Sequence, residues 1–424
     1  MNNYKLMNIS TGRVFNDAGW VLSDPESPTP SLLRSVYPNK KFELNNNDYG
    51  FYRYASWLPI CRTLENSAST ITYRSKGLAN RLGLDNLFIS FSGYWPEIGA
   101  NMTTCSFKET EAYSVCARFH PDNNKIMVVA SAGNTARAFA KVCSDNKIPL
   151  VVVIPEDNLD ALWFEKPLNK CVKIVCTPSQ TDYFDAIDLS NKICKSPMFF
   201  EEGGAKNVAR RDGMATTLLS AVNTIGRIPD YYFQAIGSGT GTIAVWEANL
   251  RLIEDGRFGN HKMILIPSQN FPFTPMFDAW KVRSRELLPF DDDEARKKAL
   301  QIKAKVLSNR RPPYSITGGL FDALKDTNGD IEIATNDESE AACELFKETE
   351  GIDIYHASGI ALAGMIKSIK SGKVSKDKVI MLNITGGGEN KFKSTHDYVM
   401  AKPDLVIDNN GDTGTICKSV ENLF

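Results

Sequence analysis

The sequence lacks the cysteine and histidine patterns that mark disulfide-rich or metal-binding proteins. It has only four histidines, and no pair among its nine cysteines has the C-x-x-C spacing. Because the cysteines are odd in number and scattered, neither a disulfide framework nor a zinc ribbon is expected, and we predict no metal site. Reduced thiols in a cytosolic enzyme fit this pattern best.

An excess of one charge and a long apolar run are also missing. Lys plus Arg is 49 and Asp plus Glu is 50, and this balance argues against a nucleic-acid partner. The longest apolar stretches, such as 148–155, are too short to cross a bilayer, and the first residues hold no signal-peptide core. We therefore expect a cytoplasmic protein that acts on small molecules and has no membrane partner.

What the sequence does contain is an alternation of short Val/Ile-rich strands and helices. The pattern predicts an α/β fold with open, twisted, mostly parallel sheets covered on both faces. A chain of 424 residues exceeds one compact core, so we expect two lobes, a smaller one at 97–205 and a larger one from 1–96 and 206–424. The first sixty residues look extended and rich in turns, and their role is not predicted. Strands are expected within 86–93, 125–134, 148–157, 172–178, 198–204, 230–241, 262–270 and 377–388, and helices within 75–84, 106–120, 135–146, 182–194, 209–226 and 290–305.

A lysine opens the helix expected at 106–120. Ser106-Phe107-Lys108 follows a polar turn that contains Gly99. An ammonium ion in a first helical turn lies against the positive end of the helix dipole, which favours a neutral amine or imine, as a Schiff-base lysine requires. Taken alone, Lys108 is more simply a solvated lysine at the start of an ordinary helix.

Two further turns between a strand and a helix contain groups that bind anions. Ser131-Ala132-Gly133-Asn134-Thr135 can hold a carboxylate or phosphate at a helix N-terminus, or can simply cap the helix. In the segment 237–242, GSGTGT, alternating glycines let the backbone approach an anion while Ser238 and Thr240 offer hydroxyls. The spacing is not the dinucleotide fingerprint G-x-G-x-x-G, so we interpret this loop as a phosphate site for a small cofactor.

The last feature is Thr385, which ends a strand and precedes Gly386-Gly387-Gly388. A hydroxyl at this position could hydrogen-bond a ring nitrogen, although a glycine-rich turn without a ligand explains the pattern equally well. All four segments lie at the carboxyl ends of expected strands, where ligands bind in open α/β sheets.

The sequence from about Thr72 to Lys391 resembles the fold-type II enzymes that depend on pyridoxal 5′-phosphate (PLP). The resemblance lies in the order of the lysine, the Asn turn, the glycine loop and the Thr-Gly-Gly segment. This is the group of tryptophan synthase β, threonine synthase and cysteine synthase. The resemblance implies that the active site lies in a cleft between two lobes and that Lys108 carries PLP as a Schiff base. It further implies that Asn134 binds the 3′-oxygen, that Gly237, Ser238, Gly239, Thr240 and Gly241 bind the phosphate, and that Thr385 faces the ring nitrogen.

Within this group the sequence is most similar to the archaeal relatives of threonine synthase that serve coenzyme M biosynthesis. The resemblance implies a β-replacement in which O-phospho-L-serine and sulfite give L-cysteate and phosphate. Threonine synthase chemistry on O-phospho-homoserine and water is the main alternative, and a catalytically inactive PLP-fold protein that binds ligands is another. Members of the group are often dimers or larger, so the resemblance allows a homo-oligomer.

The sequence departs from the group at three places that affect the substrate. One is the Asn turn, where Ser131-Ala132-Gly133-Asn134 replaces the usual Ser-Gly-Asn and Arg137 follows one turn into the helix. The lysine motif continues Lys108-Glu109-Thr110-Glu111 where threonine and cysteine synthases typically have Lys-Asp-Arg. Cys105 stands where threonine synthases commonly carry Gly, so we expect a turn that does not need a positive φ.

Both expected reactants are anions and require a cationic pocket. The residues predicted to bind them are Ser131, Thr135, Arg137, Lys206 and Arg210, with Arg211 as a further cation and His356 as a residue near the cofactor cleft.

Overall fold

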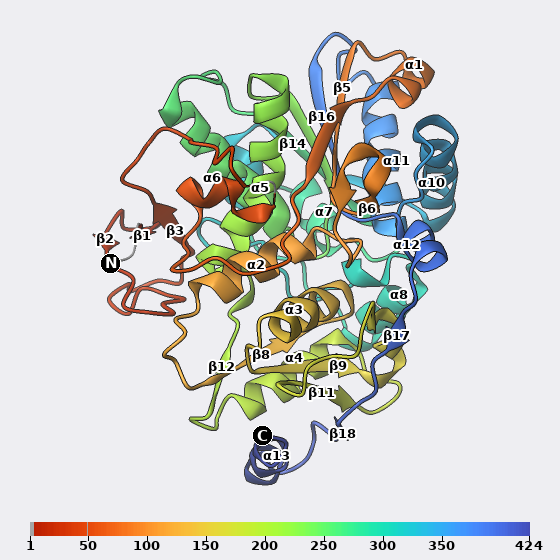
Figure 1. Ribbon diagram of the computed structural model, residues 1–424. Helices are drawn as coiled ribbons and strands as arrows, with labels where there is room; N and C mark the ends of the chain where they lie inside the picture. The colour runs from red at the N-terminus through yellow and green to blue at the C-terminus, as the bar shows by residue number, and fades with distance from the viewer. Residues whose placement is uncertain (1–3, 49) are drawn as a thin grey trace.

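Two open sheets organise the chain, one above the other in Figure 1. The computed structural model describes residues 4–48 and 50–424. The sheet of the larger lobe has the strand order β15-β14-β13-β16-β5-β4. Its strands are parallel except β4, which runs antiparallel to β5 at the edge. Their bounds are β4 Ile71–Arg74, β5 Asn86–Phe91, β13 Tyr231–Ala235, β14 Ile264–Asn270, β15 Glu332–Ala334 and β16 Val379–Ile384.

The sheet of the smaller lobe is parallel and has the order β12-β8-β9-β11-β18. Side chains of β9 are buried along the whole strand, as expected for a central strand with helices on both faces. Alternate residues enter different cores: Val152 packs into the main core while Val151 and Val153 pack into a second core under α4. The bounds are β8 Ile126–Ala130, β9 Leu150–Pro155, β11 Val172–Thr177, β12 Phe199–Glu201 and β18 Leu405–Val406.

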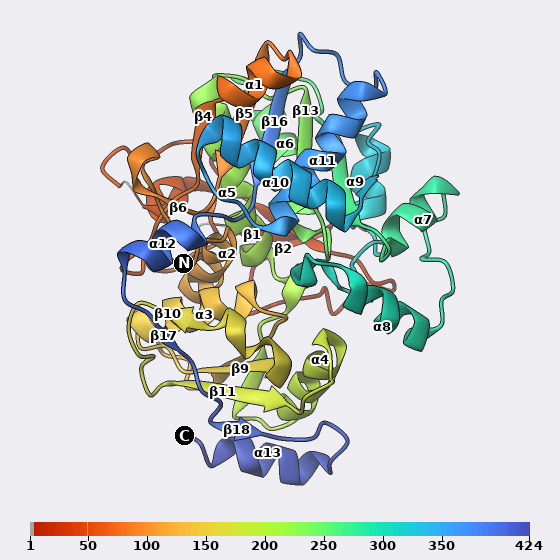
Figure 2. The same ribbon diagram turned by 90° about the vertical axis from the view of Figure 1, so that its right-hand side faces the viewer.

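Helices cover both faces of each sheet. In the larger lobe α10 and α11 lie on one face and α5 and α6 on the other, as Figures 1 and 2 show from two sides. In the smaller lobe α3 and α4 lie on opposite faces, and α2 packs between α3 and α5. The helices are α1 Gly77–Leu82, α2 Lys108–Arg118, α3 Asn134–Asp145, α4 Tyr183–Ile193, α5 Val208–Ile225, α6 Thr240–Asp255, α7 Pro275–Lys281, α8 Asp292–Gln301, α9 Leu320–Asp326, α10 Asn336–Glu350, α11 His356–Lys370, α12 Glu389–Thr395 and α13 Thr413–Glu421.

The N-terminal segment, which looked irregular in the sequence, forms a small antiparallel sheet in the order β2-β1-β3. It packs against α5 and contributes fully buried residues such as Leu6 and Leu33 to the main core. Asp17 from this segment receives the guanidinium of Arg118, the last residue of α2, at 2.8 Å. The segment is therefore tied to the helix that begins at Lys108. Its strands, and the other short strand pairs, are β1 Lys5–Asn8, β2 Val14–Phe15, β3 Leu33–Val36, β6 Tyr94–Trp95, β7 Ala100–Asn101, β10 Trp163–Phe164 and β17 Val399–Met400.

The C-terminal segment returns to the smaller lobe, which differs from the division expected from the sequence. That division placed all of 206–424 in the larger lobe, yet β18 pairs with β11 and α13 packs against α4. The physical reason is apolar burial, since Ile416 and Val420 complete the core under α4. We keep 97–205 as the proposed body of the smaller lobe, with this segment added to it.

The α/β fold with mostly parallel sheets is thus as predicted, and the expected strands and helices occur at their predicted places. The charged stretch at 290–305 contains α8, as expected for a solvated helix. Within residues 4–48 and 50–424, no helix has the length and apolar character needed to span a bilayer.

Candidate active site

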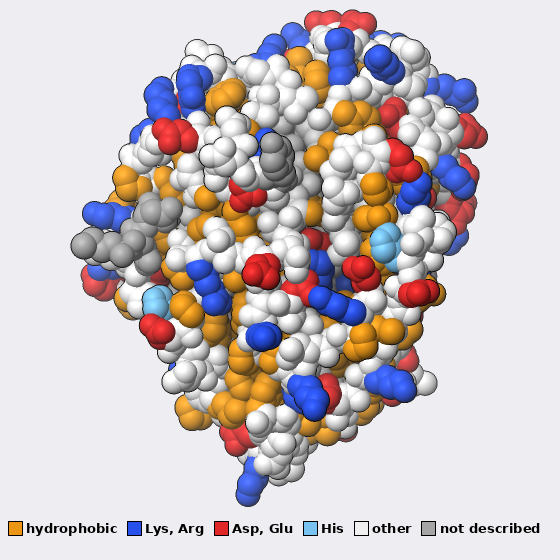
Figure 3. All heavy atoms as spheres, in the orientation of Figure 1, with side chains coloured by type: hydrophobic (Ala, Val, Ile, Leu, Met, Phe, Trp, Pro, Cys, Tyr) orange, Lys and Arg blue, Asp and Glu red, His pale blue; other side chains and the backbone are white. Residues whose placement is uncertain are grey.

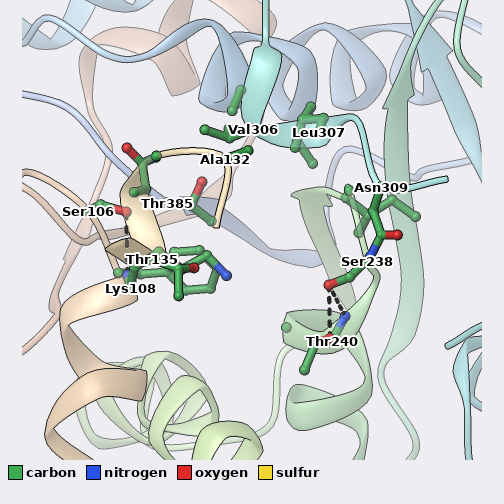
Figure 4. Close-up of a pocket in the computed structure, with 18 of the residues that line it drawn as sticks. Ser106, Lys108, Ala132, Thr135, Ser238, Thr240, Val306, Leu307, Asn309 and Thr385 are labelled. Carbon is green, nitrogen blue, oxygen red and sulfur yellow. Dashed lines mark hydrogen bonds between the residues drawn. The ribbon is translucent and has the colours of Figure 1, made fainter. Parts of the chain in front are cut away.

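A pocket lies at the carboxyl ends of strands from both sheets. Its volume is about 850 Å³, including solvent at its mouth. Residues that follow β8 line it from the smaller lobe, and residues that follow β13 and β16 line it from the larger lobe (Figure 4). The four sequence segments are therefore brought together. The lining residues used below are Ser106, Lys108, Ser131, Asn134, Thr135, Tyr183, Arg210, Gly237–Gly241, Val306, Leu307, Asn309 and Thr385.

Lys108 is the first residue of α2 and reaches into the pocket. Its backbone N–H donates to Ser106 Oγ at 3.3 Å, and its Nζ lies 3.1 Å from Glu111 Oε2 one turn further along the helix. Burial lowers the pKa of Lys108 below its usual value, Glu111 opposes that shift, and Arg210 adds to it. With a side chain 20% exposed, the amine is accessible from the pocket and easier to deprotonate than a surface lysine.

The turn before the lysine is held by the sheet of the larger lobe. The N–H of Phe107 donates to the Thr385 carbonyl at 2.9 Å, and the N–H of Gly387 donates to the Cys105 carbonyl at 3.1 Å. Cys105 has φ of 53°, so the expectation that this turn avoids a positive φ was wrong. A non-glycine residue in this region is strained and persists because its surroundings hold it. The two hydrogen bonds to β16 and its following turn supply that restraint.

The Asn turn, Ser131–Thr135, starts α3. Ser131 Oγ accepts hydrogen bonds from the N–H groups of Gly133 and Ala136, which is the helix-capping role considered for it. Asn134 Oδ1 accepts a hydrogen bond from Arg137 at 3.1 Å. The amide nitrogen of Asn134 is therefore its donor group for a ligand. Thr135 Oγ1 donates to Glu111 Oε1 at 3.0 Å.

Arg137 lies behind the Asn turn and does not line the pocket. Its guanidinium is 2% exposed and donates to the carbonyls of Thr104 and Ala161 and to the hydroxyl of Tyr355. It also stacks over the Trp163 ring, 4.3 Å from the ring centroid. With these partners, Arg137 braces Asn134 and is not positioned to meet a substrate anion.

Of the other predicted cations, Arg210 alone lines the pocket in the described part of the chain. Its Nε donates to Glu202 at 2.9 Å and its Nη1 lies 3.2 Å from Glu111 Oε1. Lys206 is exposed and lies outside the pocket lining. Arg211 is fully buried against Glu247, and the pocket is lined by the neighbours of His356 rather than by His356 itself.

The glycine loop, Gly237–Gly241, connects β13 to α6. Gly239 has φ of 78°, a left-handed conformation that glycine adopts without strain. Gly237 is required for a different reason, because a Cβ there would lie 2.9 Å from the Leu307 Cα. Ser238 and Thr240 share a hydrogen bond of 2.8 Å at the N-terminus of the helix (Figure 4). The loop therefore presents backbone N–H groups and hydroxyls at the positive end of a long helix.

Sequence reasoning missed several lining residues. Tyr183 opens α4, and burial raises the pKa of its phenol. Val306, Leu307 and Asn309 reach the pocket from the segment after α8; in Figure 4 Val306 lies beside Ala132 and Asn309 beside Ser238. No local motif marks these residues. Glu111 could have been found, because residues three apart on a helix lie on one face.

The geometry agrees with what comparison of the chain with known proteins shows. Residues 73–386 match the profile of a family described as pyridoxal-phosphate dependent enzyme. A cysteate synthase of Methanosarcina mazei is 45% identical over 96% of this chain and 97% of its own length. Those of Methanosarcina acetivorans and Methanocella arvoryzae are 46% and 45% identical over 89% of this chain, covering 91% and 90% of their own lengths. The chain belongs to the cysteate synthase family of PLP-dependent enzymes.

The chain also resembles solved structures, and at their low sequence identity this likeness shows the fold alone. Maize serine racemase superposes with a TM-score of 0.58 at 15% identity, covering 83% of this chain and 92% of that one. The serine racemase of Dictyostelium discoideum gives 0.54 at 16% identity, covering 76% and 92%. The fold-type II architecture predicted from the sequence is confirmed.

The residues present fit PLP, the cofactor of this family. Thr242 Oγ1, in the first turn of α6, is buried and has no hydrogen-bond partner among the described residues, and it adjoins Gly241, which lines the pocket. The glycine loop leads into the N-terminus of α6, where backbone N–H groups can bind an anion, and the amine of Lys108 lines the same pocket. These groups suit an aldehyde that carries a phosphate.

Proposed function

We propose that the protein catalyses a β-replacement in which O-phospho-L-serine and sulfite give L-cysteate and inorganic phosphate. The observation that best supports this function is the 45% sequence identity to a cysteate synthase over nearly the full length of both chains. In this reaction the Cβ–O bond to phosphate breaks and a Cβ–S bond to sulfite forms. A pocket that joins an accessible lysine to an anion-binding loop supports this proposal.

Lys108 is the proposed catalytic residue. Its amine would hold PLP covalently and, once free, would take the proton from the substrate Cα. When bound, PLP withdraws electrons from Cα, which makes that proton removable. The lowered pKa of Lys108 keeps a larger share of the amine neutral and able to accept the proton.

The remaining cofactor contacts are proposed from position. The glycine loop with Ser238 and Thr240 holds the phosphate, and Asn134 donates to the 3′-oxygen through its amide nitrogen. Thr385 provides a neutral hydroxyl for the ring nitrogen. A hydroxyl does not stabilise a protonated ring as a carboxylate would, so expulsion of a β leaving group is favoured over transamination.

The proposed substrate contacts are Ser131, Thr135 and Arg210, which line the pocket. Arg137 supports this site through Asn134 rather than by touching the substrate, and Lys206 is too far outside the lining to be retained. The start of α3 offers backbone N–H groups to the substrate carboxylate. A cytoplasmic location and a homo-oligomeric state stay predictions from the sequence.

The test offers the purified protein two substrates. We expect phosphate release from O-phospho-L-serine that yields cysteate only when sulfite is present, measured by a phosphate assay and by mass spectrometry of the product. Turnover of O-phospho-homoserine to threonine instead would overturn the proposal. Absence of bound PLP, judged from the visible absorbance of the lysine-bound cofactor, would overturn it in favour of a ligand-binding protein.

A further inference from the structure

A buried glutamate lies directly beside the catalytic lysine. Glu111 is 0% exposed, and its Oε2 is 3.1 Å from Lys108 Nζ. Its other oxygen accepts a hydrogen bond from Thr135 at 3.0 Å and lies 3.2 Å from Arg210 Nη1. Both carboxylate oxygens therefore have partners from α2, α3 and α5, which fix the carboxylate in one place.

Buried charges around the lysine balance only when the amine is protonated. The cluster contains the cations Lys108 and Arg210 and the carboxylates Glu111 and Glu202. When the amine is neutral, Glu111 keeps Arg210 and Thr135 as partners, so its charge is not left alone in the interior. The arrangement tolerates both protonation states of Lys108, which a base that takes and returns a proton requires.

We propose that Glu111 is a positioning residue that orients Lys108 Nζ and stabilises its ammonium form while the lysine carries the proton taken from the substrate. This inference rests on the proposed function of Lys108. The proton moves from Cα to Nζ and back, and Glu111 takes no part in the transfer.

Among the described residues, the titratable groups packed around the lysine come from four places in the fold. Glu111 lies on the same helix, Arg210 on α5, Glu202 after β12 and Tyr183 at the start of α4. Burial is the main reason that the pKa of Lys108 is low, and Glu111 is the largest opposing cause. Removing the Glu111 charge should therefore lower the pKa of Lys108 further, because only the weaker effect of Glu202 then opposes burial and the repulsion from Arg210.

The neighbouring Glu109 offers a matched control. It sits on the same helix and is equally buried, at 1% exposed. Its Oε2 accepts hydrogen bonds from the N–H and hydroxyl of Thr104, and its Oε1 lies 3.6 Å from Lys141. Glu109 does not line the pocket, and the main causes of the Lys108 pKa shift do not include it. Glu109→Gln removes the same charge from a carboxylate whose hydrogen bonds come from Thr104 rather than from Lys108 Nζ.

The test measures the protonation of Lys108 directly. The full chain, freed of PLP, is labelled with limiting acetic anhydride across a pH series, and acetylation of Lys108 is quantified by peptide mass spectrometry. In Glu111→Gln the pH midpoint of labelling should fall by about 1–3 units, the usual effect of a close opposite charge. In Glu109→Gln the midpoint should stay at the wild-type value. An unchanged midpoint in Glu111→Gln would overturn the inference.

Activity provides the second measurement. Loaded with PLP, Glu111→Gln should retain the cofactor absorbance and lose at least about tenfold in kcat with little change in KM, since general-base catalysis contributes about 10²–10⁴-fold. If Glu111→Gln does not fold, Glu111→Asp keeps the charge but withdraws it from Nζ, and a smaller downward shift of the midpoint is then expected. No shift in that variant would equally overturn the inference. Cofactor that stays covalently bound in Lys108→Ala would refute the proposed role of Lys108, and the two-substrate assay tests the proposed reaction independently of the labelling midpoint.

Discussion

The close approach of the glycine loop to the pocket wall makes Gly237→Ala a sharp test of the proposed phosphate site. A Cβ at this position would lie 2.9 Å from both the Leu307 Cα and the Val306 carbonyl oxygen. Both are backbone atoms, so no side-chain rotation can relieve the contact. Either the loop or the segment that carries Val306 and Leu307 must move, and both line the pocket.

Overpacking of this kind costs about 1–3 kcal/mol. If the bound cofactor requires the loop in its present place, that cost appears in cofactor binding and corresponds to a loss of affinity of about 5–150-fold. The assay titrates PLP into the cofactor-free variant and follows the absorbance of the lysine-bound cofactor. An affinity equal to that of the wild type would refute the assignment of this loop as the phosphate site.

Gly226→Ala is the matched control, because it perturbs a glycine that ends α5 away from the pocket. Gly226 has φ of 79° and open space around the missing Cβ. An alanine there is strained by about 1–2 kcal/mol but meets no neighbour. The variant should melt at a lower temperature and bind PLP with wild-type affinity. A matching loss of PLP affinity in both variants would mean that Gly237→Ala acts through general destabilisation.

Three other predictions follow from single contacts. Lys108→Ala should lose the cofactor absorbance and all turnover, and borohydride reduction should leave no cofactor mass on the chain; retained adduct would contradict the assignment. Asn134→Ala should bind PLP about 2–10-fold more weakly, the value of one hydrogen bond, and an unchanged titration would remove its proposed role. Arg118→Met should lower the free energy of unfolding by about 3–5 kcal/mol in urea, since it strips the buried Asp17 carboxylate of its guanidinium partner. A loss under about 1 kcal/mol would show that this ion pair does not tie down the N-terminal segment.

Strands and site segments were predictable from the sequence because local pattern determines them. The run at 150–155 is apolar throughout, and a short run of this kind between helices forms a central parallel strand. Carboxyl ends of parallel strands meet at one edge, so Asn134, the glycine loop and Thr385 could be expected near one another without any structure.

Three parts of the fold could not be predicted, because distant contacts determine them. The strands β1 to β3 are short and are stabilised by α5, α2 and the Arg118–Asp17 pair rather than by their own pattern. The C-terminal segment crosses to the smaller lobe to bury Ile416 and Val420 under α4. Cys105 holds a positive φ because the turn after β16 bonds to it, and no residue-level preference would suggest that.

The basic residues show the same limit within the site itself. Arg137 and Arg210 each lie near the start of a helix, and sequence alone treats them as equal candidates for an anion. Arg137 donates hydrogen bonds to carbonyls and a tyrosine hydroxyl and stacks on a tryptophan ring, whereas Arg210 forms ion pairs with Glu111 and Glu202 beside the pocket. Among the lining residues of the described chain the cations are Lys108 and Arg210, and both share Glu111. An anionic substrate must therefore compete with carboxylates for Arg210. Counting arginines in the sequence therefore does not predict which of them is available to an anion in this pocket.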